Sequence, residues 1–253
     1  MTVHFIGAGP GAADLITVRG RELLGTSSVC LYPGSLTPRE LLVHCPPDAR
    51  LVDTANRSLD EIIHELVTAH RQGHDVARLC SGDPAVYSAV AEQLRRLDEA
   101  EVPYELTPGV PAFAAAAAVL GRELTVPEVS QSLVLTRTQA RSTSMPEGES
   151  LATFAASGAT LALHLAIGRI DSAVGELTPH YGQYCPVAVV AHASQPNEQV
   201  LRGTLADICE QVNAAGITRS ALIFVGPALA ARSFPDSFLY SATRDRTKQP
   251  GSL

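Results

Sequence analysis

Three short turns rich in glycine and proline constrain how the first half of this chain can fold. They are Gly7–Gly11, Ser81–Pro84 and Thr107–Pro111, and each follows a short apolar run and precedes a helical pattern. Strand, turn and helix in this order are typical of an α/β sheet, whose ligands bind at the carboxyl ends of the strands. The repetition therefore predicts an α/β fold in which the three turns share one ligand pocket.

The hydrophobic pattern of this half of the chain predicts strands and helices in alternation, as expected for a parallel sheet. The predicted strands are residues 3–6, 28–32, 50–53, 75–80 and 102–106, and the predicted helices are residues 15–24, 38–43, 59–72, 86–100 and 111–120. Asp14 is expected to open the first helix. Ser58 and Glu61 have the spacing of a capping box at the start of the third.

After Gly121 the pattern changes, which predicts a second α/β lobe. Its strands are expected at residues 132–136, 160–165, 187–192, 199–204 and 221–225, and its helices at 150–156, 171–177 and 205–215. We expect lobes over residues 1–120 and 121–229, a mobile polar loop over 139–149 and a partly disordered tail over 230–253.

The first turn matches the loose dinucleotide-binding pattern Gly7-x-Gly9-x-x-Ala12. A Rossmann site would also need an acidic residue at the end of the second strand to hold a ribose, but that strand ends Leu31-Tyr32-Pro33. Pro10 also removes a backbone N–H that a pyrophosphate would use. The pattern therefore disfavours a nucleotide-dependent oxidoreductase.

Composition excludes several other classes. The net charge of −7 argues against a nucleic-acid binder that works by neutralising phosphates. There is no apolar run of about 20 residues and no export signal, so we expect a cytoplasmic protein. The five cysteines are scattered without a Cys-x-x-Cys pair, and the histidines near residues 64–74 do not share one helix face. No metal site is predicted.

With these turns the chain resembles the tetrapyrrole methyltransferase family. The matching strings are Gly7–Gly11 with Asp14–Thr17, Ser81–Pro84 and Thr107–Val110. Longer strings resemble the branch that methylates precorrin-4 in cobalamin synthesis, namely Leu31-Tyr32 with Ser35-Leu36, Phe113 with its alanine run, Glu123–Glu128, Leu135–Arg137 and Gln195–Glu198. The resemblance covers nearly the whole chain except the tail.

The resemblance implies two α/β lobes with S-adenosylmethionine in the cleft between them, and a homodimer. Position by position, the cofactor contacts of the family would fall on Pro10, Ser81, Gly82, Asp83, Val86, Pro111, Ala112, Leu165, Ala193 and Ala221. Asp83 is expected to order its loop or to meet the polar end of the cofactor, and no residue is assigned as a catalytic base.

The implied reaction is methyl transfer to carbon 11 of precorrin-4, which gives precorrin-5 and S-adenosylhomocysteine. The alternatives are the same transfer to cobalt-precorrin-4, methylation of another tetrapyrrole carbon or of a non-tetrapyrrole acceptor, and a non-catalytic tetrapyrrole carrier. Because a precorrin bears many carboxylates while the chain is acidic, binding must use local basic groups. Arg137 and Arg141, together with Asp14, are the candidate substrate contacts, and Arg137 is favoured because an arginine at a strand end can hold a carboxylate with two hydrogen bonds.

Overall fold

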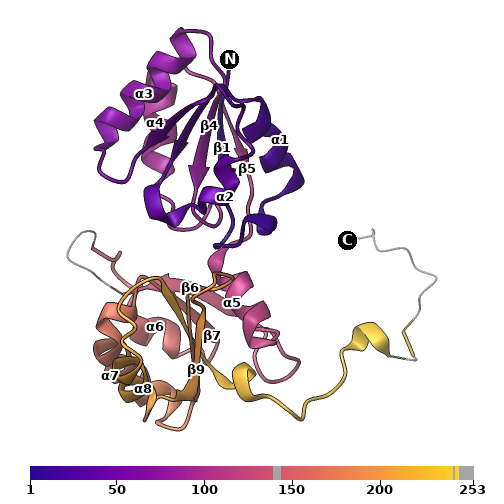
Figure 1. The fold of residues 1–253 in the computed structure, drawn as a ribbon. Helices are drawn as coiled ribbons and strands as arrows, with labels where there is room; N and C mark the ends of the chain where they lie inside the picture. Colours follow the sequence, from indigo (N-terminus) through magenta and orange to yellow (C-terminus); the bar gives the residue numbers. More distant parts are fainter. Residues whose placement is uncertain (139–143, 242, 245–253) are drawn as a thin grey trace. The chain divides into compact units, whose positions relative to one another are not determined.

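The computed structural model describes residues 1–138, 144–241 and 243–244, and the chain divides into two compact units. Unit 1 contains Met1–Val119 and His192–Glu198, and unit 2 contains Leu120–Ala191 and Gln199–Leu253. Both are α/β units, as predicted (Figure 1). The division departs from the expected boundaries at His192–Glu198, which contacts unit 1 although both of its flanking strands belong to unit 2.

The described strands of unit 1 form one parallel sheet in the order β3-β2-β4-β1-β5. Their bounds are β1 Val3–Gly7, β2 Val29–Tyr32, β3 Arg50–Asp53, β4 Val76–Cys80 and β5 Tyr104–Thr107. All of β4 is buried, as expected for a central strand that is covered on both faces. The three turns of the sequence follow β1, β4 and β5, which are neighbours in this sheet.

Helices cover both faces of this sheet (Figure 1). They are α1 Val18–Thr26, α2 Arg39–Leu42, α3 Leu59–Arg71 and α4 Ala91–Glu99. After β5 the chain continues into α5 Ala112–Leu120, which contributes no residue to either of the two cores of this sheet described next. Leu66 of α3 and Leu97 of α4 pack with Phe5 on one face, whereas Leu24 of α1 and Leu41 of α2 enter a second core on the other. The sheet is therefore doubly wound, which places the three turns at its carboxyl edge.

Three helices begin three or more residues later than the sequence predicts. The one expected over residues 205–215 begins at Ile208, and the other two lie in unit 1. Asp14 lies in a short 3₁₀ turn, and α1 begins at Val18 because Thr17 is the N-cap, whose hydroxyl accepts the Gly20 N–H at 3.1 Å. In α4 the delay is five residues. Tyr87 and Ala89 have positive φ angles of 52° and 49°, so the chain leaves Ser81–Pro84 as an irregular loop before the helix starts at Ala91.

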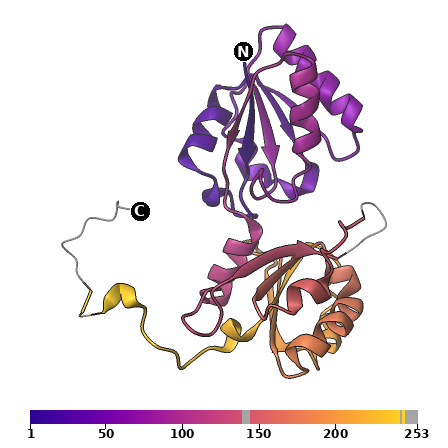
Figure 2. The same cartoon turned by 180° about the vertical axis from the view of Figure 1, so that it is seen from behind.

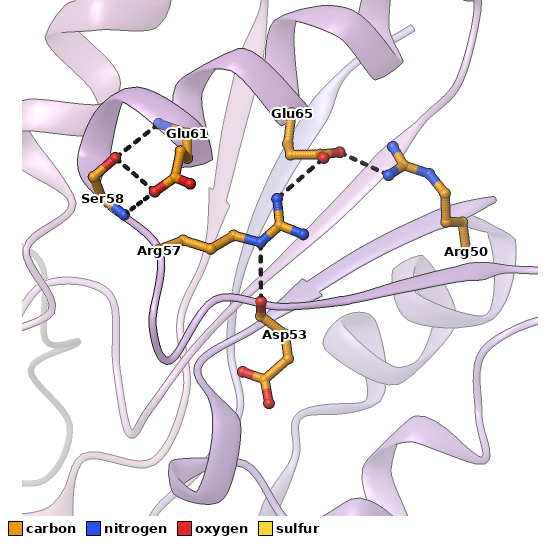
Figure 3. A network of polar contacts seen from close by, with 6 residues as sticks. All are labelled: Arg50, Asp53, Arg57, Ser58, Glu61 and Glu65. Atoms are coloured by element: carbon orange, nitrogen blue, oxygen red, sulfur yellow. Dashed lines mark hydrogen bonds and ion pairs between the residues drawn. The ribbon is translucent and has the colours of Figure 1, made fainter.

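The predicted capping box at the start of α3 is confirmed (Figure 3). The Ser58 N–H donates to Glu61 at 2.7 Å, and the Glu61 N–H donates to the Ser58 hydroxyl at 3.3 Å. Beside it, Glu65 accepts from Arg50 at 2.7 Å and from Arg57 at 3.1 Å. These hydrogen bonds, the one from Arg50 first, hold the pKa of the Glu65 carboxyl below its usual range.

The described strands of unit 2 form a mixed sheet in the order β6-β7-β10-β8-β9. Figure 2 shows this unit from behind. Their bounds are β6 Leu133–Arg137, β7 Thr160–His164, β8 Pro186–Ala191, β9 Gln199–Thr204 and β10 Ala221–Val225. Only the β6–β7 pair of these is parallel. All five lie within about a residue of the predicted positions.

One face of this sheet is covered by α6 Leu151–Ala155, α7 Ile170–Tyr181 and α8 Ile208–Ala214. Ile170, Leu177 and Ile208 of these helices pack against Leu163 and Val189 of the sheet in a single core. Residues 139–143 of the predicted mobile loop, and residues 242 and 245–253 of the predicted disordered tail, lie outside the described residues.

Candidate functional site

The three turns that follow β4, β1 and β5 meet through their backbones. A Cβ built on Gly109 would lie 2.7 Å from the Gly7 Cα, and one built on Gly7 would lie 2.8 Å from the carbonyl oxygen of Gly82. Such separations leave no room for a side chain, so each turn needs glycine where it touches the next. The turns form one continuous surface of main chain at the carboxyl edge of the sheet.

Hydrogen bonds join the first two turns directly. The Gly9 N–H donates to the Gly82 carbonyl at 3.2 Å, and the Gly82 N–H donates to the Gly9 carbonyl at 2.8 Å. Both glycines have positive φ angles, 77° and 66°, which other residues adopt only at a cost. The contacts thus form an isolated antiparallel bridge beyond the parallel β1–β4 ladder and fix the first turn against the second.

Asp83 joins the second turn to the third. One carboxylate oxygen accepts the Ala85 N–H at 2.7 Å, and the other accepts the Gly109 N–H at 2.8 Å. The Ser88 hydroxyl donates to the Asp83 carbonyl at 2.6 Å. These contacts show that Asp83 orders its loop, which is one of the two roles that the sequence left open.

The residues of unit 1 predicted to contact a cofactor lie in or beside these turns. Pro111 and Ala112 lie beside Gly82, since a Cβ on Gly82 would be 3.7 Å from the Pro111 Cα and from the Ala112 nitrogen. The Val86 N–H donates to the Asp83 carbonyl at 3.3 Å. The structure brings together Pro10, Ser81, Gly82, Asp83, Val86, Pro111 and Ala112.

A segment from late in the chain completes the first turn. Ser194 accepts the Ala12 N–H at 3.0 Å through its hydroxyl, and the Gln195 side chain donates to the Pro10 carbonyl at 3.5 Å. A Cβ on Gly11 would lie 3.1 Å from the Ala193 carbonyl, so the predicted contact Ala193 is also here. Beside it a cavity of about 350 Å³ is lined by Gly11, Leu36, Glu40 and Ser194 among others. The sequence marked Gln195–Glu198 only by family resemblance, and nothing local placed it against Pro10.

In unit 2 the predicted residues gather at one end of the sheet. Arg137 pairs with His164 across β6 and β7, and Leu165 follows at once. Ala221, the first residue of β10, lies opposite Ala191 of β8, and the antiparallel register of β7 and β10 places it next to Leu165. Leu165 is 68% exposed and has a φ of 53°, a backbone conformation that costs free energy for a leucine.

Arg137 lines a cavity of about 530 Å³ together with Arg169, Glu149 and Glu176. Its guanidinium donates to the carbonyls of Thr138 at 3.5 Å and Ser144 at 3.3 Å. The lining therefore carries two positive and two negative side chains, and a carboxylate of a ligand could pair only with the two arginines.

The other two candidate substrate contacts are less informative. Arg141 lies outside the described residues. Asp14 is exposed in the 3₁₀ turn that follows the glycine-rich turn of unit 1.

His164, which the sequence did not single out, sits at this sheet end with its ring largely desolvated. Burial lowers its pKa to about 4. A depressed pKa means that the fold favours the neutral ring, so the stability it contributes is present above pH 6.5 and is lost as the pH falls toward 4. After allowance for solvent screening, we expect the free energy of unfolding to fall by about 1–2 kcal/mol between pH 7.5 and pH 5 because of this ring.

Urea unfolding of His164→Gln at both pH values checks this. The variant should lose less stability than the wild type on acidification, whereas His64→Gln, at an exposed position of α3, should behave like the wild type. An equal loss in His164→Gln and the wild type would contradict the assignment.

Among the described residues, no group of three or more histidine, cysteine, aspartate or glutamate side chains is placed to hold a metal ion. Likewise, no helix in that part of the chain combines the length and apolar character needed to cross a membrane.

Comparison with known proteins assigns the chain to a family. Residues 2–209 match the model of the tetrapyrrole (corrin/porphyrin) methylases. A precorrin-4 C(11)-methyltransferase of Rhodococcus erythropolis is 63% identical over 247 residues, which are 98% of this chain and 99% of that protein.

Comparison with solved structures leads to the same family. A cobalt-precorrin-4 methyltransferase has a TM-score of 0.87 at 37% identity and covers 90% of this chain and 95% of its own. A uroporphyrin-III C-methyltransferase of Thermus thermophilus, complexed with S-adenosylhomocysteine, has a TM-score of 0.76 at 26% identity and covers 90% and 93%. With the fold, the three turns and these matches in agreement, the chain belongs to the tetrapyrrole methylase family.

Proposed function

We propose that this chain transfers a methyl group from S-adenosylmethionine to carbon 11 of precorrin-4, giving precorrin-5 and S-adenosylhomocysteine. The proposal rests on the main-chain surface formed by Gly7, Gly82 and Gly109, in a chain 63% identical to a protein named for this reaction. Membership of a methylase family disfavours the oxidoreductase and the non-catalytic carrier.

The residues of unit 1 suit a sulfonium cofactor. A surface of main chain offers carbonyl dipoles, which stabilise positive charge without presenting a competing nucleophile. Pro10, Ser81–Asp83, Val86, Pro111, Ala112 and Ala193 would hold the cofactor, and Leu165 and Ala221 are the contacts proposed from unit 2. When bound, S-adenosylmethionine supplies a methyl group that already carries a good leaving group.

The chain's own contribution is then mainly to position the reactants. Asp83 holds the second and third turns in a fixed relation through two backbone N–H groups. Because both of its oxygens accept these bonds, we assign it a positioning role and not that of a base. Arg137 would hold a carboxylate of the tetrapyrrole, and with Arg169 it supplies the cationic side of the cavity in unit 2.

The decisive experiment is incubation with S-adenosylmethionine and precorrin-4, with and without cobalt in the ring, followed by NMR location of the new methyl group. We expect transfer to carbon 11 of the metal-free substrate. Faster transfer to cobalt-precorrin-4 would favour the alternative suggested by the solved cobalt-precorrin-4 methyltransferase. Absence of transfer to both would refute the proposal.

Size-exclusion chromatography with light scattering would test the homodimer that we infer from the family.

Replacement of Arg137 by alanine tests the substrate contact. We expect the KM for the tetrapyrrole to rise about tenfold with a smaller change in kcat, because the charge-assisted hydrogen bonds to a carboxylate are lost. Arg137→Lys should recover only part of the effect, since lysine keeps the charge but not the planar fork. Arg50→Ala, at a residue engaged by Glu65, is the control and should leave KM unchanged. An unchanged KM in Arg137→Ala would show that the assignment is wrong.

A further inference from the structure

A second cavity in unit 2 has an unusual concentration of positive charge. Its volume is about 200 Å³, and its lining includes Arg122, Arg202 and Arg232, with Leu120, Val187 and Leu229 beneath them. The arginines come from three separate segments: the turn after α5, strand β9 and the chain after residue 230. Val187 and Leu229 are buried, so the floor of the cavity is apolar.

Two of these arginines are held in place by main-chain carbonyls. Arg202 donates to the carbonyl of Leu120, the last residue of α5, at 3.0 Å. Arg122 donates to the carbonyl of Ala231 at 3.4 Å. Each of these bonds uses one of the five N–H donors of a guanidinium. The backbone contacts therefore fix the two side chains and leave most of their donors available.

Carboxylates do not balance this charge. None of the described residues that line the cavity is acidic, and none of the ion pairs found in the described part of the chain involves these arginines. Asp207 lies near the lining residue Gly203, where it accepts the Thr204 N–H at 2.6 Å and the Gln211 amide at 3.1 Å. It keeps its negative charge there, so it can offset at most one of the three positive charges. Arg122 is partly buried, whereas Arg202 and Arg232 are exposed, so the three positive charges are accessible to an anion from solvent. In a chain with a net charge of −7, this local excess of positive charge favours an anionic ligand.

We propose that this cavity is an anion-binding site, separate from the site of methyl transfer, that takes one phosphate or carboxylate group of a small ligand. Guanidinium groups pair with both oxyanions through two parallel hydrogen bonds. The volume is smaller than that of sites for drug-sized ligands, so only a group of a few heavy atoms is enclosed. The apolar floor would contact the carbon atoms next to that group.

Calorimetric titration of the full chain with inorganic phosphate and, separately, with succinate tests the proposal, with sodium chloride at equal ionic strength as the blank. We expect saturable binding of at least one of the two, and their relative affinities distinguish a phosphate ligand from a carboxylate ligand. Arg202→Gln and Arg122→Gln should each weaken binding about tenfold, as expected when a charge-assisted contact is lost.

Because those two arginines also support the backbone, Arg232→Gln is the variant that keeps the test independent of folding, and it too should weaken binding. Arg71→Gln, on the exposed last turn of α3, is the control and should bind like the wild type. Asp83→Ala should also bind the anion normally, which separates this site from the proposed methyl-transfer site. Absence of saturable binding, or equal binding by wild type and Arg232→Gln, would overturn the proposal.

Discussion

Replacing Gly109 with alanine is expected to abolish measurable binding of S-adenosylhomocysteine. The new Cβ would lie 2.7 Å from the Gly7 Cα and 2.9 Å from the Gly7 carbonyl carbon, so one backbone must move away from the other. The φ angle of Gly109 is not in the left-handed region, so the penalty comes from the contact and not from the conformation of the residue itself. Overpacking of this kind costs about 1–3 kcal/mol, and here the displaced atoms belong to the proposed binding surface.

Calorimetry with S-adenosylhomocysteine and urea unfolding together check this prediction. Gly175→Ala is a matched control, because it makes the same chemical change inside α7 with no atom within 4 Å of the new Cβ. Alanine is the better helix former by about 1 kcal/mol, so this control should be stabilised and should bind normally. Wild-type affinity in a folded Gly109→Ala would mean that the contact of the three turns does not shape the binding surface.

Replacing Asp83 with alanine should weaken S-adenosylhomocysteine binding at least tenfold while the protein remains folded. The variant removes the acceptor for the Ala85 and Gly109 N–H groups, which frees the third turn from the second. Each lost hydrogen bond to a charged group lowers the free energy of unfolding by about 1.5–3 kcal/mol. A domain of ordinary stability can tolerate this loss. Binding of S-adenosylhomocysteine depends on the relative position of the turns, so it should weaken in a variant that is still folded.

Asp53→Ala separates this effect from the loss of a local turn. Asp53 accepts the Ala55 N–H at 2.8 Å, the same i to i+2 bond that Asp83 makes to Ala85, but it lies at the end of the edge strand β3. We expect Asp53→Ala to bind S-adenosylhomocysteine normally. If Asp83→Ala is folded and its calorimetric affinity is unaltered, the Ser81–Pro84 turn has no role in cofactor binding.

Features that depend on neighbouring residues could be predicted from the sequence. The capping box of Ser58 and Glu61 is a contact across three residues, and the buried strand β4 is a continuous apolar run apart from Arg78. The convergence of the three turns was also predictable, because the carboxyl ends of parallel strands lie at one edge of the sheet.

Features that depend on distant contacts were missed. The helical pattern after Pro84 predicted a helix from residue 86, but the chain first folds around Asp83, whose carbonyl accepts the Ser88 hydroxyl. Nothing local indicates that Asp83 reaches the Gly109 N–H, or that Arg122, Arg202 and Arg232 share a cavity. Each of these results from tertiary packing, which local propensity does not encode.

The position of His192–Glu198 has a consequence for synthesis of the protein. Unit 1 takes nearly all of its residues from the first half of the chain, yet its first turn is completed by the Ser194 hydroxyl and the Gln195 side chain. A nascent chain can form the five strands of that sheet early, but the Ala12 N–H and the Pro10 carbonyl are left to bond with water until Ser194 and Gln195 have left the ribosome. The proposed ligand-binding edge is therefore completed late in translation, and a fragment that ends at residue 119 would contain the sheet without these two contacts.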